Sequence, residues 1–519
     1  MRLFPMNESQ ARARLVQAGA VLAAVALVAG CGSAYRPAVT PINSSGPAAQ
    51  VTSYVVVVSA PGATTPGINT TPGIATIIDY SGDTVLADAP IGPGPTTFTI
   101  DETGSTGYTV NSDSTLSNFP IAVTGNGSLQ AKNVLFSTLS SASQPGPPHP
   151  PINMFSPSAG LWTADLGGSY VDYFTGSPQA FKLAIPVAPT PIAIIGPSVT
   201  GQYNYAISQN IPNPTGVECN VAANWASEPA GEADAIGTST YSVSARIPLG
   251  KCPVYAVQSP DYRRFFVLNR GDDTVSVINS QTNALDSCTP FLNQNGQTVT
   301  CHPSLPLSTS AGLPQDANED VPNVAGPVYA EYNAATSQLI VADYDGNAIT
   351  VIDVSLDEYG NDSSTFGTTF TIPVGKSPIS VTALADGSRA YAANQTDQTV
   401  TIVNLSSHTV EKTLPIYGHP RTVVSTQNST EGKVYVASPD SDYLTILRTD
   451  LDIVDTTILV QGNIVDVRVT TQNGSGGNNN TISRTPGYGE PCLRPPTPAN
   501  PIPPPTGTET PLQACQALQ

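Results

Sequence analysis

Side chains that commonly carry out chemistry are few and widely spaced in this sequence. Only four histidines occur, at His149, His302, His408 and His419. None has a partner at helical spacing and no serine lies in a nucleophile elbow, so local motifs predict neither a zinc-binding helix nor a hydrolase triad. Glycine-rich phosphate loops, HExxH and CxxCH are also absent from the sequence. We therefore predict no catalytic residue and no cofactor.

His419 is the histidine whose position best suits a role in a channel. It precedes Pro420 at the start of a run that we expect to be an innermost strand, from which its side chain would point towards a central channel. The equivalent residue in the preceding unit is Ser377, which has no imidazole, so a structural role is favoured over a functional one.

The turn that contains Asp343 and Asp345 resembles the opening of a calcium loop. Oxygen ligands two residues apart in a turn can converge on a hard cation, but the bidentate glutamate that closes such a loop is absent. The equivalent stretches 269–273 and 438–442 carry similar polar residues. The pattern therefore favours a repeated turn between strands, and no metal site is predicted.

The chain is acidic, with a formal net charge of −19 and a pI near 4.4. Nucleic acid binding requires clustered Lys and Arg that release counterions from phosphates, so we exclude nucleic acid as a partner. The acidic loop 316–320 is a candidate site for calcium or a cationic partner, although a solvated surface loop is the favoured interpretation.

The N-terminus has the pattern of an export signal. Arg2, Arg12 and Arg14 precede an apolar run over 18–29 that is too short to span a bilayer. The run ends in Leu27-Val28-Ala29-Gly30-Cys31, which resembles the lipobox of bacterial lipoproteins. The resemblance implies a signal peptide over 1–30, cleavage before Cys31, and lipidation and acylation of that cysteine. Residues 31–50, rich in Ser, Pro, Ala and Thr, would form a tether to the membrane.

The six other cysteines form an even set in an exported chain, which predicts disulfides. Six cysteines allow 15 connectivities, and we expect neighbours in the sequence to pair. The expected pairs are Cys219 with Cys252, Cys288 with Cys301, and Cys492 with Cys515.

Short β-rich runs separated by polar turns recur over residues 51–470. Only 11% of residues are charged, and the 49 prolines and 43 glycines argue against helical classes. The expected units are 54–58, 74–79 and 84–88; 97–101, 107–111 and 116–121; 133–138, 161–165, 169–174 and 181–186, with the Pro-rich loop 144–151 after the first strand; 191–195, 203–208 and 240–248; 253–258, 264–268 and 274–278; 328–332, 338–342, 348–353 and 368–374; 378–384, 389–393, 399–403 and 410–414; and 421–426, 433–437, 443–447 and 453–459.

These units predict an all-β fold, a single propeller of four-stranded antiparallel blades. The run 464–470 has no unit of its own, and the first unit lacks an innermost strand. Pairing the two closes the ring and removes exposed sheet edges. We expect eight blades, or seven if the divergent second and third units merge. The Pro-, Gly- and Asn-rich segment 471–519 is expected to be a disordered tail.

The stretches 265–279 and 391–404 resemble the YVTN family of β-propeller repeats. That family carries a Thr-Ile-Pro-Val-Gly-x-x-Pro stretch between blades, which appears here as Thr371-Ile-Pro-Val-Gly-Lys-Ser-Pro378 and more loosely over 413–420. The match covers 253–459 well and 51–250 weakly. Proteins with this repeat are mostly bacterial and archaeal exported proteins, commonly without an assigned activity, so the resemblance implies a location more than a reaction.

The leading expectation is a non-enzymatic lipoprotein of the bacterial cell envelope, held at the membrane through Cys31. In a Gram-negative envelope, Gly32 after the cysteine favours the outer membrane. Its propeller would bind a protein, glycan or small molecule through loops between strands. The alternative is an exported enzyme, such as a lactonase-like hydrolase, with its site at the mouth of the central channel. An enzyme would need polar groups from several blades to converge on one substrate position.

Overall fold

The computed structural model describes residues 54–61, 71–79, 82–113, 115–121, 132–135, 151–157, 160–165, 168–176, 179–198, 200–211, 229–293, 296–307, 325–426 and 432–470. All of them belong to one unit of the chain, Thr52–Gln519. The predicted signal peptide, tether and tail lie outside these residues, as do Cys31, Cys219, Cys492, Cys515, His149 and the acidic loop 316–320. Within the described residues, no helix has the length and apolar character needed to cross a membrane.

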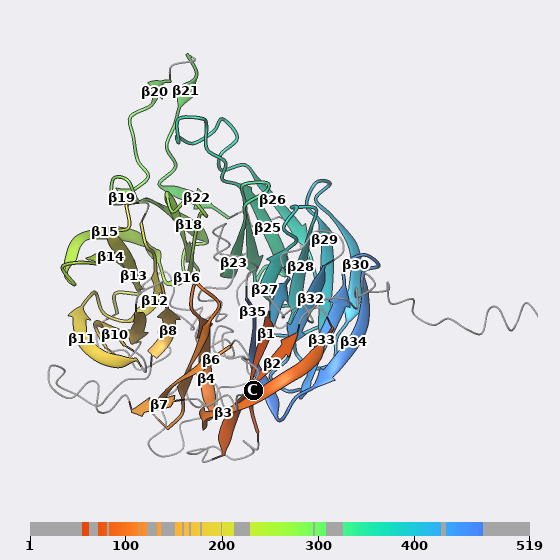
Figure 1. Ribbon diagram of the computed structural model, residues 1–519. Helices are drawn as coiled ribbons and strands as arrows, with labels where there is room; N and C mark the ends of the chain where they lie inside the picture. The colour runs from red at the N-terminus through yellow and green to blue at the C-terminus, as the bar shows by residue number, and fades with distance from the viewer. Residues whose placement is uncertain are drawn as a thin grey trace, which may run out of the picture. The chain divides into compact units, whose positions relative to one another are not determined.

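The described chain forms eight four-stranded antiparallel blades, as predicted (Figure 1). From innermost to outermost strand they are blade 1, β35 (Asn463–Val469), β1 (Tyr54–Ala60), β2 (Pro72–Asp79) and β3 (Thr84–Pro93); blade 2, β4 (Pro95–Ile100), β5 (Thr106–Asn111), β6 (Thr115–Pro120) and β7 (Lys132–Leu135); blade 3, β8 (Pro151–Phe155), β9 (Leu161–Asp165), β10 (Tyr170–Thr175) and β11 (Ala180–Pro186); and blade 4, β12 (Pro191–Ile195), β13 (Tyr203–Ser208), β14 (Ala230–Gly237) and β15 (Val243–Lys251).

The second half of the chain continues the same order. It forms blade 5, β16 (Pro253–Gln258), β17 (Arg264–Asn269), β18 (Thr274–Asn279) and β19 (Ala284–Leu285) with β22 (Ser304–Pro306); blade 6, β23 (Pro327–Asn333), β24 (Gln338–Asp343), β25 (Ala348–Asp353) and β26 (Thr369–Pro373); blade 7, β27 (Pro378–Ala383), β28 (Arg389–Asn394), β29 (Thr399–Asn404) and β30 (Thr409–Pro415); and blade 8, β31 (Thr422–Ser425), β32 (Lys433–Ala437), β33 (Tyr443–Arg448) and β34 (Ile453–Leu459).

The ring is closed by β35, the last strand among the residues that the structure describes. β35 pairs with β1 in antiparallel register, with Val57 opposite Val467, and supplies the innermost strand of blade 1. Each innermost strand contacts those of the two flanking blades around the whole ring. The predicted closure and the count of eight blades are therefore confirmed, and the seven-blade alternative is wrong.

The apolar core lies between blades. Each cluster of buried side chains joins residues of neighbouring blades, such as Val57 of β1 with Tyr435 and Ile446 of blade 8. The same holds around the ring, with clusters between blades 1 and 2, 2 and 3, 3 and 4, 4 and 5, and through blades 5 to 8. Since no blade buries both faces alone, the repeats stabilise one another.

Two strand assignments made from the sequence are wrong. The run at 133–138 was expected to open the third unit, but β7 (Lys132–Leu135) pairs with β6 and is the outermost strand of blade 2. Blade 3 instead begins with β8 at Pro151, a residue placed in the Pro-rich loop. Proline fits there because the first residue of a strand need not donate to the ladder. The Pro-rich stretch therefore separates two blades.

Blade 4 also differs from the expectation. Its third strand is β14 (Ala230–Gly237), which was not predicted, and the run expected at 240–248 belongs to the fourth strand, β15. Apart from Ile236, β14 consists of Ala, Gly, Glu and Asp, residues that are depleted in strands. Its place between two other strands, and not its propensity, makes it a strand.

The outermost strand of blade 5 is interrupted. β19 and β22 both pair with β18, and residues 286–303 are inserted between them. The insertion carries the hairpin of β20 (Phe291–Leu292) and β21 (Thr298–Val299). In Figure 1 this hairpin extends beyond the blades, near the connection that precedes β26. We call residues 286–303 the blade 5 insertion and residues 354–368, which connect β25 to β26, the blade 6 loop.

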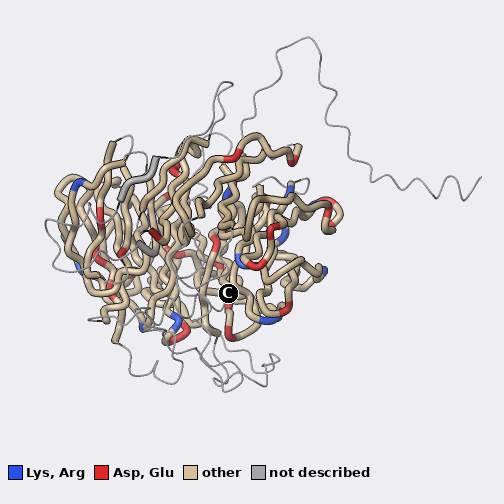
Figure 2. The backbone as a smooth tube through the Cα atoms, turned by 90° about the horizontal axis from the view of Figure 1, so that it is seen from below, with Lys and Arg blue, Asp and Glu red and all other residues tan. Residues whose placement is uncertain are grey.

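Charged residues are scattered over the described chain and are not collected on one element (Figure 2). The 39 acidic and 20 basic residues are spread along a chain of 519 residues. The net charge of −19 is therefore not concentrated on any one described element. Candidate sites must therefore be sought in local constellations of side chains.

Candidate functional site

A repeated ion pair joins consecutive blades at the turn between the third and fourth strands. In blade 7, the Tyr391 hydroxyl donates to Asp452 of blade 8 at 2.9 Å, and Arg389 forms an ion pair with the same carboxylate. Between blades 8 and 1, Tyr435 and Lys433 bond Asp83 at 3.0 and 2.7 Å. A basic residue that begins the second strand therefore reaches an aspartate of the next blade.

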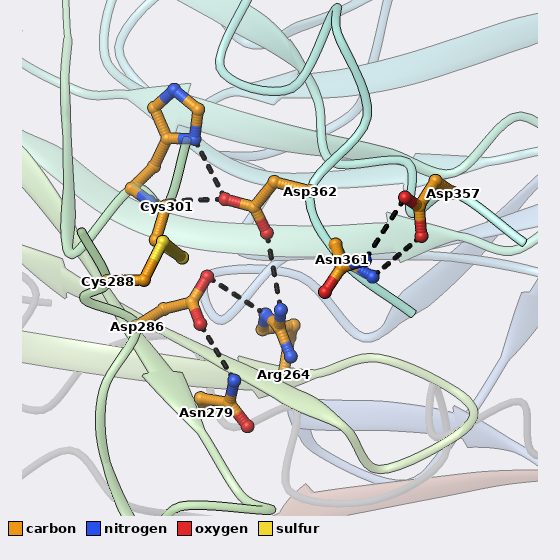
Figure 3. The surroundings of a disulfide bond; sticks show 9 residues. Arg264, Asn279, Asp286, Cys288, Cys301, Asp357, Asn361 and Asp362 are labelled. Atoms are coloured by element: carbon orange, nitrogen blue, oxygen red, sulfur yellow. Dashed lines mark hydrogen bonds and ion pairs between the residues drawn. A yellow bond between two sulfur atoms is a disulfide. The ribbon is translucent and has the colours of Figure 1, made fainter. Parts of the chain in front are cut away.

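Arg264 begins the second strand of blade 5, the position that Arg389 and Lys433 hold in blades 7 and 8. It pairs with two aspartates, whereas those residues each pair with one. Its side chain is 3% exposed, and its guanidinium lies 3.3 Å from Asp286 of the blade 5 insertion and 3.3 Å from Asp362 of the blade 6 loop. Figure 3 shows Asp286 and Asp362 both joined to Arg264, near the Cys288–Cys301 disulfide. Two inserted segments thus replace the single aspartate of a tight turn.

His302 extends this cluster towards the surface. A single oxygen of Asp362 accepts the backbone N–H of His302 at 3.1 Å and lies 2.8 Å from ring Nδ1. The ring stacks on Phe366, with centroids 5.2 Å apart, and the side chain is 32% exposed. Because Asp362 holds Nδ1, the other ring nitrogen, Nε2, is the one available to another molecule.

The electrostatics of the cluster are those of a buried ion-pair network, in which Arg264 Nε and Asp286 Oδ2 lie 3.3 Å apart. Burial raises the pKa of Asp362 to about 6, while His302 and Arg264 act in the opposite direction. Asp286 accepts a further hydrogen bond from the Asn279 amide at 2.8 Å. The arrangement holds an imidazole in a fixed orientation, as a general base requires. In the described residues no hydroxyl nucleophile bonds His302, so the network orders the loops and does not form a triad.

The two segments above this cluster are joined to each other. Cys288 and Cys301 form the disulfide expected from the sequence, with Cα atoms 5.5 Å apart, at the base of the β20–β21 hairpin. The side chain of Asn293, which follows β20, hydrogen-bonds Asp357 of the blade 6 loop. The disulfide closes a short loop, which stabilises the folded state by about 3 kcal/mol. The hairpin is thus held at its base and at its side.

The surface of these segments is apolar at three points. Phe291 and Leu292 of β20 are 43% and 68% exposed, and Tyr359 of the blade 6 loop is 43% exposed. Large apolar side chains on a stapled hairpin are candidates for contact with a partner, because loops on a rigid scaffold commonly carry binding residues. The candidate site therefore consists of this surface and the Arg264–Asp362–His302 network beneath it.

Cys252 is disulfide-bonded as well. Cys219, the partner we expect, lies outside the described residues, so that pairing stays a prediction, as does the pairing of Cys492 with Cys515.

Asp343 has a structural place in the fold. In blades 2, 5 and 7 the second strand ends in asparagine, whose amide donates to a hydroxyl of the third strand, as Asn394 does to Thr401 at 2.8 Å. Asp343 replaces that asparagine in blade 6 and bonds Thr350 at 2.5 Å. Burial raises the pKa of Asp343 well above its usual range. A protonated carboxyl can imitate an amide, which accounts for an acid in this buried place.

Asp345 is also occupied. Its carboxylate pairs with the buried guanidinium of Arg270, at 2.7 and 2.8 Å from Nη2, across blades 5 and 6. The two carboxylates of this turn are therefore engaged separately, and they do not converge on a cation. In the described part of the chain, no group of three or more His, Cys, Asp or Glu side chains is placed to hold a metal ion.

His419 lies over turns that join second to third strands. Asp440 of blade 8 lies 2.6 Å from its Nδ1 and accepts its backbone N–H at 2.7 Å, and Gln398 of blade 7 lies 3.0 Å from its Nε2. His408 is placed differently, stacked on Phe370 at 3.7 Å between blades 6 and 7. The described histidines are therefore dispersed over the molecule.

The innermost strands do not form a reactive centre. Along them the charged residues are Glu331 of β23 and the pair Asp466 and Arg468 of β35. Each bonds a neighbouring blade: Glu331 accepts the backbone N–H of Ala383 in blade 7, Asp466 accepts the hydroxyl of Thr422 in blade 8, and Arg468 donates to the carbonyl of Phe98 in blade 2 at 3.0 Å. These charges hold neighbouring blades together and do not converge from three or more blades on a substrate.

A buried carboxyl pair in blade 3 was missed in the sequence. Asp165 and Asp172 are seven residues apart, the spacing of Asn394 and Thr401, and both are 4% exposed. Burial raises the pKa of Asp172 to about 7 and that of Asp165 well above its usual range. The signal in the sequence was the seven-residue spacing, which places Asp172 of the third strand against Asp165 at the end of the second strand. In blade 3 both of these repeat positions hold an aspartate.

Arg264, Asp286 and Asp362 were missed as well. The signal for Arg264 was its place at the start of a second strand, equivalent to Arg389 and Lys433. Asp362 had no such signal, since it lies in an irregular loop 98 residues further along the chain.

Comparison with known proteins gives the fold. No protein-family model and no curated protein matches the chain. Among solved structures, apo AztD from Citrobacter koseri is 12% identical and covers 81% of this chain and 99% of its own, with a TM-score of 0.51. Dihydro-heme d1 dehydrogenase NirN, in complex with DHE, is 12% identical and covers 80% of this chain and 75% of its own, with a TM-score of 0.53. At this identity the likeness concerns the β-propeller fold alone.

Replacing Arg264 by Gln should destabilise the protein strongly. Without the guanidinium, Asp286 and Asp362 are left buried without their counter-charge, which lowers the free energy of unfolding by about 3–5 kcal/mol. Urea unfolding near pH 8 measures the loss, which should shrink near pH 5 as Asp362 takes up a proton. The matched control is Arg263→Gln, whose side chain is 38% exposed in its pair with the exposed Asp261 and contributes about 1 kcal/mol or less. Equal losses in the two variants would contradict the role given to the cluster.

Replacing Asp172 by Asn should flatten the dependence of stability on pH. Folded Asp172 keeps its proton up to about pH 7, whereas an unfolded aspartate releases it near pH 4. The folded state therefore binds more protons in this window, and wild-type stability falls as pH rises from about 4 to about 7, by on the order of 2–4 kcal/mol from this group.

The variant should lack this part of the decline in unfolding free energies measured across the window. The double variant Asp165→Asn and Asp172→Thr, which reproduces the pair of blade 7, serves as the control for a satisfied site. Identical slopes for wild type and Asp172→Asn would refute the assignment.

Proposed function

We propose that this chain is a lipid-anchored binding scaffold of the bacterial cell envelope, and that its partner is a protein that contacts the blade 5 insertion and the blade 6 loop. The observation that best supports this proposal is the hairpin held by the Cys288–Cys301 disulfide, which exposes Phe291 and Leu292, together with the exposed Tyr359 of the blade 6 loop. At the seams of blades 7 with 8 and 8 with 1 the described turns bond the neighbouring blade, whereas these two segments extend beyond that need.

Several features support binding over catalysis. The buried charges below the hairpin satisfy one another through Arg264, and those of the innermost strands bond neighbouring blades. A rigid base lowers the ordering entropy that a loop loses on binding, which favours affinity. The likeness to YVTN repeats over 253–459 and the lipobox-like stretch ending in Cys31 support an exported scaffold.

A hydrolase is the second candidate, because Asp362 fixes the orientation of the His302 ring, as the carboxylate of a catalytic triad fixes the histidine that serves as general base. In that case the partner of the site would be a small substrate, and Nε2 of His302 would have to contact the reacting group. His302→Gln distinguishes the two, since it would abolish hydrolysis and leave a protein contact at the hairpin intact.

A photo-crosslinking residue placed at Leu292 or Tyr359 of the full-length protein should yield the same discrete adduct in cells. Purified wild-type protein should compete for it, and protein with Leu292→Asp should not, because a charge in an apolar contact is costly to desolvate. The matched control is Val410, 43% exposed on β30 of blade 7, which should yield no adduct. Adducts of equal yield at Val410, or none at either test position, would overturn the proposal.

Cys31→Ser should abolish lipidation and release the protein from the membrane fraction. The lipid is attached through the thiol, which serine lacks, and two or more acyl chains are needed for stable anchoring. Incorporation of labelled palmitate and fractionation of cells measure the change, with Cys288→Ser as a control that should keep the label. Absence of label from the wild-type protein would show that the signal is an ordinary secretory one, and persistent labelling of Cys31→Ser would place the lipid on another residue.

A further inference from the structure

Blades 2, 5 and 7 share a pairing of glycine with asparagine at the connection that leads from the preceding blade into their innermost strand. The glycines Gly92, Gly250 and Gly375 lie against the asparagine that ends the second strand of the blade they enter. A Cβ on Gly250 or Gly375 would come within 2.6 Å of the amide nitrogen of Asn269 or Asn394, and one on Gly92 would clash with Asn111. Glycine is needed there because the asparagine amide occupies the space and bonds the third strand.

Blade 8 departs from this pairing at both positions. Residues 413–420 align without gaps with 371–378, and Tyr417 stands where blade 7 is entered through Gly375. The asparagine is replaced by Ser438, whose side chain is too short to reach Thr445, seven residues on. The buried Oγ1 of Thr445 has no hydrogen-bond partner, which destabilises the blade. A sequence that gives up a structural bond to admit a large side chain points to a function of that side chain.

The tyrosine admitted in this way is displayed and not buried. Tyr417 is 65% exposed, the ring of Tyr443 is 37% exposed, and their centroids lie 5.8 Å apart at an interplanar angle of 82°. Gly418, with φ of +82°, holds the connection against the turn of blade 8, where a Cβ would lie 2.6 Å from Asp440. Two rings at right angles therefore form two walls at the seam of blades 7 and 8.

Planar polar side chains border these walls. His419 follows Gly418, and its ring is held between Asp440 and the amide of Gln398 at 2.6 and 3.0 Å. Asp440 receives two donors from His419, which occupy both of its oxygens. The border thus offers the Gln398 amide and the tyrosine hydroxyl groups to a ligand, whereas both ring nitrogens of His419 and the carboxylate of Asp440 are already engaged.

We propose that Tyr417 and Tyr443, with Gln398 and His419 at their border, bind a neutral oligosaccharide. The apolar face of a sugar ring packs on an exposed aromatic ring, while its hydroxyls require a mixture of donors and acceptors at the edge. An anion would meet Asp440 and no cation that the site provides for it, and a cation would have to displace His419 from Asp440. The blade 5 insertion contributes nothing to this site, so the proposal is independent of the protein partner proposed above.

Isothermal titration with chitotetraose, cellotetraose and maltotetraose tests the proposal on the soluble full-length chain carrying Cys31→Ser. At least one sugar should bind, with an affinity that changes by less than about twofold between low and high salt, because no charge pair is formed. Tyr417→Gly restores the residue of blades 2, 5 and 7, so it should fold, and it should lower the affinity by at least tenfold. Tyr417→Phe should keep the affinity within about threefold, since the ring face is retained.

Tyr359→Ala is the matched control, since it removes a tyrosine of 43% exposure on the blade 6 loop and should leave sugar affinity unchanged. Saturation-transfer spectra should show contact between sugar protons and the protein in wild type but not in Tyr417→Gly. The proposal is overturned if none of the three sugars binds or if Tyr417→Gly binds as wild type does. Salt-sensitive binding of tetralysine that is lost in Tyr417→Gly would overturn it as well, by assigning the surface to a cationic ligand.

Discussion

The pairing of β35 with β1 is the constraint on which the rest of the structure depends. Without it blade 1 would have three strands, and the innermost ring would have a gap between blades 8 and 2. The strand also carries its own links to both neighbours: Asp466 accepts the Thr422 hydroxyl of blade 8 at 2.8 Å, and the fully buried Arg468 donates to Phe98 of blade 2. The hydrogen-bonded edge and the buried ion pair are thus made by seven residues from the far end of the chain.

The sequence was most informative where apolar runs coincide with strands. Blades 5 to 8 are built from β-branched runs such as Thr399–Asn404, so their strand boundaries were predicted nearly to the residue, except for the interrupted outermost strand of blade 5, which was not predicted. β14 (Ala230–Gly237) is a strand only because β13 and β15 flank it, which no local propensity can show. β7 and β8 were misassigned because the choice of blade for a strand depends on its partner, and a long Pro-rich stretch hides which partner that is.

The candidate site was less accessible to prediction than the fold. Asp343 and Asp345 were noticed because their spacing resembles a cation loop, yet the packing of blade 6 assigns one to Thr350 and the other to Arg270. Arg264 was missed, although its repeat position was a usable signal, since Arg389 and Lys433 stand in the same place. Asp286, His302 and Asp362 come from irregular segments, and only the folding of two insertions against each other brings them to Arg264.

Both proposed binding surfaces lie where the chain departs from its own repeat. In a closed ring each blade is held by two neighbours, so one blade can lose a regular bond or gain an insertion without loss of the fold. Blade 5 interrupts its outer strand and retains a disulfide at that point, and blade 8 exchanges an asparagine and a glycine for Ser438 and Tyr417. Drift alone would be expected to leave short, polar replacements in such places. A stapled hairpin with apolar tips and a displayed pair of tyrosines are instead the features that recognition requires, and the regular blades between them supply the rigidity.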